Sequence, residues 1–233
     1  MKVGVVIFPG SNCDQDAIYA FQNIFGCEVV LLFHKENDLQ GCDLIFLPGG
    51  FSYGDYLRSG AIARFSPIMQ NVIDFANKGG LVWGVCNGFQ ILCESQLLPG
   101  ALLHNENQKF NCKNVHIKSQ TTNSIITGKT NVNQALKIPI AHGEGKFYCD
   151  EQTLVALKNN DQVLFRYCDE NGNVTPESNP NGSLESIAGI CNAGRNVFGM
   201  MPHPERVVDS QLYNTDGRIL FESLLGATAK SVL

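Results

Sequence analysis

A short apolar run at residues 81–85 stops at a Gly-x-Cys-x-Gly pattern, and apolar residues with helical spacing follow directly after it. A buried strand that turns sharply into a helix needs small residues on both sides of the turn, since a larger side chain would collide with neighbouring backbone. The strained turn lifts one side chain above the carboxyl end of the sheet. We therefore expect the Cys86 thiol to point into solvent, where the amino end of the helix favours its thiolate. The alternative is an inert cysteine buried in the core.

Similar apolar runs alternate with helical patterns through the first hundred residues. Strands buried on both faces are expected at residues 3–8, 29–33, 44–47 and 81–85. Helices are expected at residues 14–26 and, from a single apolar stripe, at residues 62–76. Strand–helix–strand alternation gives right-handed crossovers and a parallel sheet covered on both faces. The expected fold class is therefore α/β, a flavodoxin-like open and mostly parallel sheet with helices on both faces.

The pattern changes after residue 100. Shorter, partly exposed strands at residues 115–117 and 136–140 are expected to add to the sheet in antiparallel fashion. The expected elements that follow are a helix at 151–157, a strand at 163–167, a polar loop at 170–183, a hairpin of 187–191 with 197–201, and a helix at 218–225. The sequence contains no linker, internal repeat or low-complexity tract, so residues 1–233 are expected to form one domain.

Composition limits the classes of function. Of the 233 residues, 44% are hydrophobic and 17% are charged, which is typical of a globular protein with a substantial core. The net charge of −5 argues against nucleic acid or an anionic membrane as a partner. The 9 cysteines include no C-x-x-C pair and indicate reduced thiols in a cytoplasmic protein. The chain begins directly with a strand pattern, without a signal peptide or a segment long enough to span a bilayer.

A nucleophilic thiol needs a base to take its proton and a third group to orient that base. A Met-Pro-His-Pro-Glu motif, residues 201–205, follows another apolar strand. Prolines on both sides of His203 favour an extended backbone, and residues two apart on an extended segment project to the same side. Glu205 is therefore expected to orient His203, and together with Cys86 they predict acyl transfer. The alternative for residues 201–205 is a surface turn with no partner.

Consecutive glycines follow the strand expected at residues 44–47, and glycine lets backbone amides approach a ligand closely. Gly50 and Asn87, the residue after the nucleophile, are expected to donate their amides to a tetrahedral oxyanion. The loop lacks the GxxxxGK[ST] and GxGxxG patterns of phosphate-binding loops, and no HExxH or clustered Cys/His set predicts a metal site. Four other residues are interpreted as ordinary surface or core residues: His34, His104, His116 and Cys93.

Together these motifs resemble a known family. The elbow at residues 84–90 and the pair His203-x-Glu205 resemble the class I, or triad, glutamine amidotransferases. Further motifs narrow the resemblance to the glutaminase subunits of phosphoribosylformylglycinamidine synthase: residues 9–14 (PGSNCD), 48–56 (PGGFSYGDY), 60–63 (GAIA), 141–145 (AHGEG) and 200–206 (MMPHPER). The resemblance extends over essentially the whole chain, although the loop at residues 170–183 is long for the family.

The resemblance implies that Cys86 attacks the side-chain amide of glutamine, and that Gln90, His142 and Gly143 help to hold this substrate. It also implies a large synthetase subunit, which uses ATP and Mg²⁺ to convert formylglycinamide ribonucleotide to formylglycinamidine ribonucleotide in purine biosynthesis. A small third subunit is expected to bridge the two. The chain itself is expected to need no cofactor, because it has no ATP-binding motif and is too short to include a synthetase.

Two other functions stay open at this point. A peptidase- or chaperone-like protein of flavodoxin type would also carry an elbow cysteine, but such proteins place an acidic residue near the thiol and lack the late His-x-Glu pair. A non-enzymatic subunit that kept the fold and regulates a synthetase would carry the same motifs.

Overall fold

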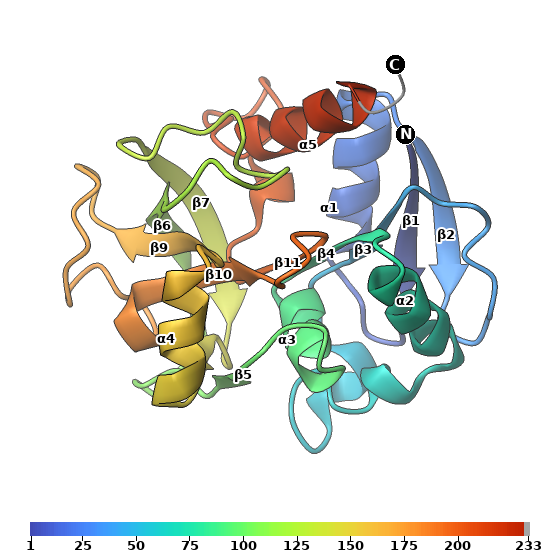
Figure 1. Cartoon of the computed structure of the whole chain (residues 1–233), viewed down its shortest axis with the longest axis horizontal. Coiled ribbons are helices and arrows are strands. Elements are labelled where there is room, and N and C mark those ends of the chain that lie inside the picture. Colours follow the sequence, from blue (N-terminus) through green and yellow to red (C-terminus); the bar gives the residue numbers. More distant parts are fainter. Residues whose placement is uncertain (231–233) are drawn as a thin grey trace.

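The computed structural model describes residues 1–230 as a nine-stranded sheet flanked by helices (Figure 1). The strands lie in the order β2-β1-β3-β4-β11-β10-β9-β6-β7. Their bounds are β1 (Lys2–Ile7), β2 (Glu28–Phe33), β3 (Leu44–Leu47), β4 (Leu81–Val85), β6 (Asn111–Ser119), β7 (Ala135–His142), β9 (Val163–Cys168), β10 (Ile187–Cys191) and β11 (Val197–Met200). A separate ribbon pairs β5 (Ala101–Leu103) with β8 (Lys146–Tyr148), two strands that the sequence pattern does not predict.

The sheet has a parallel half and an antiparallel half. Strands β2, β1, β3, β4 and β11 pair in parallel, and every pairing from β11 to β7 is antiparallel. The α/β class and the antiparallel additions are confirmed, but the sheet is half parallel rather than mostly parallel. The prediction that the strands now seen as β6 and β7 are short was wrong: they contain 9 and 8 residues. Polar residues extend β6, because their backbone pairs with β7 while several of their side chains stay exposed.

Helices cover both faces of this sheet. They are α1 (Asp14–Ile18), α2 (Pro67–Asn77), α3 (Asn87–Glu94), α4 (Glu151–Asn159) and α5 (Arg218–Lys230), with short 3-10 segments at Ser52–Asp55, Ala63–Phe65, Leu184–Ser186 and Pro204–Arg206. In Figure 1, α1 and α5 lie on one face of the parallel half, and α2 and α3 lie on the other. Helix α1 continues as a π-helical segment, Tyr19–Ile24, so the helix predicted at residues 14–26 is present with a change of winding. Phe221 of α5 packs against Phe21 and Trp83, with ring centroids 5.0 Å apart in both pairs, and joins this layer to the core.

Two predicted elements differ in detail. The helix predicted at residues 62–76 starts only at Pro67, because Ser66 adopts the extended backbone that a following proline favours. Phe65 therefore precedes the helix and is exposed. Strand β2 forms the edge of the sheet, so Leu31 and Phe33 are exposed and the prediction that this strand is buried on both faces was wrong.

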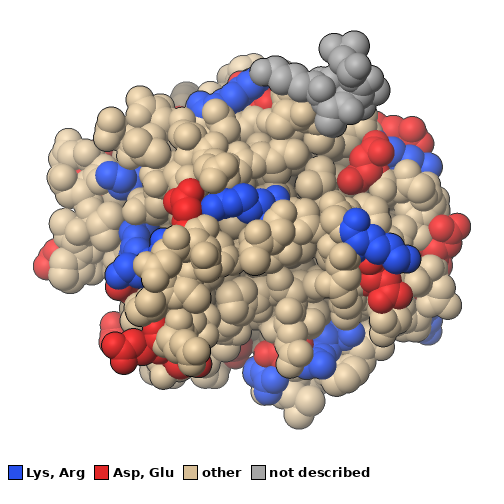
Figure 2. All heavy atoms as spheres, viewed as in Figure 1, with Lys and Arg blue, Asp and Glu red and all other residues tan. Residues whose placement is uncertain are grey.

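The described surface is mixed in charge on the face drawn in Figure 2, where Lys and Arg side chains lie among Asp and Glu side chains. Of the helices within residues 1–230, none has the length and apolar character required to cross a membrane. The cysteines of this part of the chain are all free, and Cys112 is exposed while the others are buried.

The elbow between β4 and α3 depends on close backbone contact. Cys86 has φ 53° and ψ −109°, a conformation that non-glycine residues rarely adopt. A Cβ atom on Gly88 would lie 1.9 Å from the carbonyl oxygen of Leu47, and one on Gly84 would lie 2.6 Å from the backbone of Gly88. The small residues at these two positions therefore allow α3 to pack directly against the end of β3.

Replacing Gly88 by alanine should disrupt this packing. We expect Gly88→Ala to lower the free energy of unfolding by about 3 kcal/mol or more, because backbone has to move to admit the methyl group. Urea denaturation followed by circular dichroism measures the change. Gly128→Ala is the matched control, since its Cβ would lie at an ordinary 3.4 Å from Ser124 O, and its effect should stay within about 0.5 kcal/mol. Equal stability of the two variants would contradict this account of the elbow.

Candidate active site

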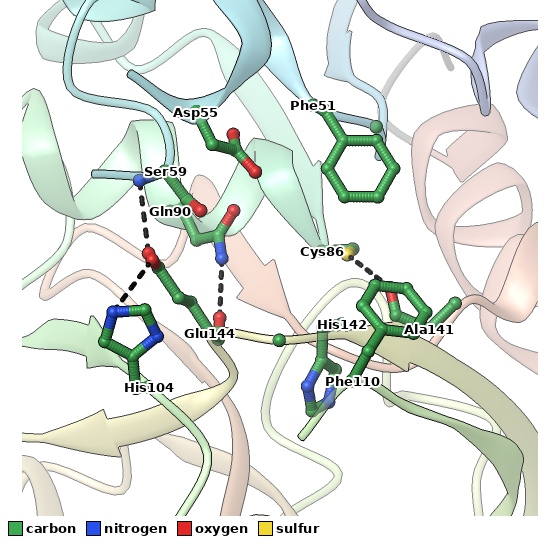
Figure 3. A pocket seen from close by; sticks show the side chains of 12 residues that line it. Phe51, Asp55, Ser59, Cys86, Gln90, His104, Phe110, Ala141, His142 and Glu144 are labelled. Carbon is green, nitrogen blue, oxygen red and sulfur yellow. Dashed lines mark hydrogen bonds and ion pairs between the residues drawn. The ribbon is translucent and has the colours of Figure 1, made fainter. Parts of the chain in front are cut away.

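A cavity of about 140 Å³ opens where the loops after β3, β4 and β7 meet (Figure 3). Its lining residues are Gly50, Phe51, Asp55, Ser59, Cys86, Gln90, His104, Phe110, Ala141, His142, Gly143 and Glu144. Ligand sites of open α/β sheets lie at the carboxyl ends of the parallel strands. The cavity has this position, and it contains the elbow cysteine.

Cys86 lies at the bottom of the cavity and is 4% exposed, so the expectation that its thiol points into solvent was wrong. Phe51 and Phe110 enclose the elbow, with ring centroids 6.2 Å apart, and both remain partly exposed at the rim. The Cys86 thiol is not sealed in the core, because it faces the cavity, and its Sγ lies 3.7 Å from Ala141 O. A ligand that enters the cavity can therefore reach the sulfur.

His203 and Glu205 form a buried pair beside the elbow. The Nδ1 atom of His203 lies 2.6 Å from Oε1 of Glu205, and both side chains are almost completely excluded from solvent. A Cβ atom on Gly49 would lie 2.6 Å from His203 Cε1 and 3.3 Å from Cys86 Cβ. The imidazole and the cysteine thus pack against the same glycine, and the structure brings together the three residues that the motifs single out.

The electrostatics of this set favour a charged imidazole. Burial lowers the pKa of His203, but the charges of Glu205 and Cys86 together outweigh burial and raise it to about 10. Within residues 1–230, no atom forms a hydrogen bond of normal length with His203 Nε2. In this conformation the Cys86 sulfur therefore makes no hydrogen bond of normal length with the imidazole, as in other unliganded sites in which hydrogen bonds tighten only with substrate.

A second cysteine, Cys13, also packs against Gly49. A Cβ atom on this glycine would lie 3.2 Å from the Cys13 sulfur. Its Sγ accepts a hydrogen bond from Arg206 Nη2 at 3.0 Å. Burial nevertheless raises the pKa of Cys13 to about 12, against the opposing charge of Arg206. Cys13 is therefore a neutral thiol at physiological pH and does not compete as a nucleophile.

The two residues expected to form the oxyanion hole flank the nucleophile. Gly50 lines the cavity with φ +137°, and a Cβ atom there would lie 2.7 Å from Asn12 N. Asn87 begins α3, whose first amides have no partner within the helix. The Asn87 side chain accepts a hydrogen bond from Ser52 N at 3.2 Å and thus ties the glycine loop to the elbow.

The residues expected to hold the substrate all line the cavity. Gln90 donates from Nε2 to Glu144 O at 2.5 Å and accepts from Asn87 Nδ2 at 2.9 Å, so its amide connects the elbow to the loop after β7. His142 is buried against Asn105 Oδ1, 3.0 Å from its Nδ1, and burial together with the charge of His203 lowers its pKa to about 4. The His142 imidazole is therefore neutral at physiological pH. Gly143 follows His142 directly and also lines the cavity.

Four lining residues with polar side chains were not selected from the sequence: Asp55, Ser59, His104 and Glu144. His104, interpreted as an ordinary surface or core residue, is exposed but also lines the cavity, and its Nε2 lies 3.5 Å from Glu144 Oε1. Asp55 and Glu144 stand inside recognisable motifs, but only the fold shows that they face the same cavity as Cys86. His34 also has a hydrogen-bond partner, because its Nδ1 lies 2.6 Å from the hydroxyl of Tyr53. This contact anchors the glycine loop that follows β3.

Comparison with known proteins agrees with this geometry. Residues 1–219 match the CobB/CobQ-like glutamine amidotransferase domain. The chain is 56% identical to phosphoribosylformylglycinamidine synthase subunit PurQ of Koribacter versatilis, over 99% of this chain and 100% of that protein. It is 53% identical to the PurQ subunit of Salinibacter ruber, over 96% and 95% of the two chains. A chain in the structure of PurLQS from Thermotoga maritima superposes with a TM-score of 0.85 at 40% identity, over 97% of this chain and 98% of that one.

The chain therefore belongs to the CobB/CobQ-like glutamine amidotransferases and, within them, to the PurQ subunits of phosphoribosylformylglycinamidine synthase. It is a glutaminase subunit of an enzyme of purine biosynthesis, and the family and activity that the motifs suggested are confirmed. A glutamine amidotransferase from Thermotoga maritima, 13% identical with a TM-score of 0.56, shares the fold.

The buried His203–Glu205 pair should make stability depend on pH. A histidine in the unfolded chain titrates near pH 6.5. Because the pKa in the folded state is raised, the stabilisation is fully present below this pH and is lost as pH rises to about 10. We expect the free energy of unfolding to fall over this window with a slope of up to about 1.4 kcal/mol per pH unit from this group.

Urea denaturation at a series of pH values measures this slope. Glu205→Gln should flatten it, because the charge that raises the pKa of His203 is removed. Glu170→Gln changes an exposed carboxylate elsewhere and should leave the slope intact. A Glu205→Gln profile that runs parallel to that of the wild-type protein would show that the pair does not hold a proton in the folded state.

Proposed function

We propose that the chain hydrolyses glutamine through a thioester on Cys86, with His203 as the general acid and base and Glu205 as the group that orients it. The observation that carries this assignment is the convergence of Cys86 and His203 on Gly49, with Glu205 held 2.6 Å from the imidazole. This is the nucleophile, base and orienting-group arrangement of acyl transfer. The ammonia that is released serves the conversion of formylglycinamide ribonucleotide to formylglycinamidine ribonucleotide.

In the first step, the Cys86 thiolate attacks the side-chain amide carbon of glutamine and forms a tetrahedral intermediate. The carbonyl oxygen gains negative charge, and the amides of Gly50 and Asn87 are suited to stabilise it from the two sides of the elbow. One such donor contributes about 3 to 4 kcal/mol to the transition state. The hydrogen bond from Ser52 N to Asn87 Oδ1 connects the glycine loop to the elbow and so positions the Gly50 amide before the substrate arrives.

In the second step, the intermediate collapses, the carbon–nitrogen bond breaks, and ammonia leaves with a proton from His203. A water molecule, deprotonated by the now neutral His203, then attacks the glutamyl thioester. Glutamate and the free thiol are released. Glu205 keeps the imidazole in one orientation through both transfers. Gln90, His142 and Gly143 are proposed to hold the substrate, since all three line the cavity.

The chain is proposed to work in a complex with a large synthetase subunit and a small bridging subunit. Support comes from the PurLQS structure of Thermotoga maritima, whose name joins PurL, PurQ and PurS. ATP and Mg²⁺ are assigned to the synthetase. We also propose that residues 1–233 form one domain, since the nine-stranded sheet takes its strands from Lys2 to Met200 of the described residues 1–230. We further propose that the protein is cytoplasmic, where its free thiols stay reduced.

Replacing the nucleophile distinguishes glutamine hydrolysis on this chain from the use of ammonia by the synthetase. In the complex, Cys86→Ser should reduce glutamine-dependent synthesis at least about 10³-fold, because the hydroxyl is a much weaker nucleophile. Synthesis from added ammonium chloride should continue, since the synthetase is intact. Cys112→Ser, at an exposed thiol, is the control and should leave both activities unchanged. Full retention of glutamine-dependent synthesis by Cys86→Ser would instead favour a non-enzymatic regulatory subunit.

The cavity rim provides a docking surface for the synthetase. Tyr56 is 74% exposed and Leu57 is 90% exposed, and both lie between the cavity residues Asp55 and Ser59. Exposed apolar side chains at such a position mark an interaction site. Ammonia has to pass to the partner without escaping, so the partner has to cover this opening.

A charge in the rim should therefore weaken the complex. We expect Leu57→Asp to raise the dissociation constant for the synthetase at least about tenfold, as measured by analytical ultracentrifugation. Val155→Asp, at an exposed position on α4, should leave the constant unchanged. Equal affinities of the two variants would place the docking surface elsewhere on the chain.

A further inference from the structure

Asn105 lies shortly after β5 and has a completely buried side chain to which the glutaminase chemistry assigns no role. Its Nδ2 donates hydrogen bonds to His142 O and Lys109 O, each at 2.8 Å. Its Oδ1 accepts from Gly145 N at 3.0 Å and lies 3.0 Å from Nδ1 of His142. Asn105 therefore holds both the backbone and the ring of His142, although it does not itself line the cavity.

These partners determine which nitrogen of His142 carries a proton. A backbone N–H donates and a backbone carbonyl accepts, so the bonds to Gly145 N and to the two carbonyls fix which end of the Asn105 amide is oxygen. An amide oxygen cannot donate, so Nδ1 of His142 has to donate to it. In a neutral imidazole with its proton on Nδ1, the Nε2 atom has a free lone pair and accepts hydrogen bonds.

The His142 imidazole is held neutral and in place. It is 3% exposed, and burial, together with the charge of His203, lowers its pKa to about 4. A Cβ atom on Gly145 would lie 2.6 Å from Nε2 of the ring, so the imidazole packs directly against this backbone. Turning the ring over would exchange its two nitrogens at the cost of the bond to Asn105.

Nε2 of His142 is the unsatisfied atom of this arrangement. It is buried, and none of the described residues gives it a hydrogen-bond partner. Buried polar atoms in native proteins are normally paired, and an unpaired one is costly. Because His142 lines the cavity (Figure 3), a molecule in the cavity is placed to supply the donor.

The reaction at Cys86 brings such a donor close to this wall. The amide nitrogen of glutamine has two N–H groups and gains another proton from His203 as its bond to carbon breaks. Ala141, directly before His142, has its carbonyl oxygen 3.7 Å from Cys86 Sγ. We propose that Asn105 is a positioning residue of the glutaminase, which holds His142 in the tautomer whose Nε2 accepts a hydrogen bond from the departing nitrogen. No proton passes to His142 in this step, and the inference rests on the proposed hydrolysis at Cys86.

The opposite tautomer would hinder the same step. A proton on Nε2 would face the N–H groups of the departing nitrogen, and two donors cannot form a hydrogen bond with each other. A purely structural Asn105, by contrast, would brace the loop through Gly145 N and His142 O, and the state of Nε2 would not matter for the reaction. The state of Nε2 is therefore the property to measure.

The tautomer is measured directly in the full chain. Long-range proton–nitrogen correlation spectra, with the heavy nitrogen isotope in histidine, distinguish a proton on Nδ1 from one on Nε2. The variant His142→Gln identifies the His142 signals among those of the 5 histidines. We expect the Nδ1–H form of His142 at neutral pH. An Nε2–H form or a doubly protonated ring would overturn the inference.

Asparagine and glutamine substitutions of His142 separate the two ring nitrogens. The amide of His142→Asn reaches the position of Nδ1 and keeps a donor for Asn105, but it leaves no group at the position of Nε2. His142→Gln is longer and places an oxygen acceptor there. In the complex, we expect kcat with glutamine to be at least about tenfold lower in His142→Asn than in His142→Gln, whereas both should keep synthesis from ammonium chloride. Equal kcat values with glutamine, or the reverse order, would overturn the inference.

A double-mutant cycle tests whether Asn105 acts through His142. Asn105→Ala should lower kcat with glutamine at least about tenfold in the otherwise wild-type complex, and less than about threefold in a His142→Asn complex, where the acceptor is already missing. Asn171→Ala, at an exposed position, is the control and should leave kcat unchanged in both. The same factor in both backgrounds would indicate a purely structural Asn105 and overturn the inference. If Asn105→Ala does not fold, the wild-type spectrum and the two His142 variants decide.

The outcomes for the two proposals are distinct. If Cys86→Ser retained glutamine-dependent synthesis, the proposed hydrolysis itself would fail. If Cys86→Ser lost that activity while His142→Asn and His142→Gln had equal kcat values, only the role assigned to Asn105 would fail.

Discussion

The site depends on glycine positions where no side chain intervenes and neighbouring groups pack directly against the backbone. Gly88 brings α3 against the carbonyl oxygen of Leu47, and Gly49 lets His203 and Cys86 approach from opposite elements. Any Cβ atom at these positions would separate β3 from the elbow. Because interiors are densely packed, such a separation would move the nucleophile, the base and the glycine loop together. The catalytic arrangement therefore depends on the close approach between the carboxyl end of β3 and the elbow that follows β4.

A second constraint is electrostatic. His203 and Glu205 are both excluded from water, where either charge alone would be costly. Together they form a short pair that keeps the imidazole charged, and the neighbouring Cys86 also raises the pKa of His203. Breaking a buried pair is more costly than its net contribution to stability suggests. The base is thus held in its protonated form by the same contacts that hold it in place.

Local signals in the sequence were sufficient for the elbow and for the His203–Glu205 pair, because glycines and prolines restrict the backbone at those positions themselves. They were not sufficient for the burial of Cys86, which depends on Phe51 and Phe110 from loops far apart in the chain. The convergence of Asp55 and Glu144 likewise depends on where β7 ends in a sheet of nine strands. Periodicity also placed the start of α2 too early, since a proline overrides the apolar pattern there.

The loop that carries Asp55 lies between the cavity and the proposed docking surface. Tyr56 and Leu57 follow Asp55 directly and are exposed at the rim, so a partner that docks there contacts the same turn that presents the carboxylate to the cavity. If docking restricts this turn, glutamine binds a site that is already ordered. By linkage, bound glutamine then tightens the complex by the same factor. Such coupling would confine the release of ammonia to complexes in which a synthetase covers the opening.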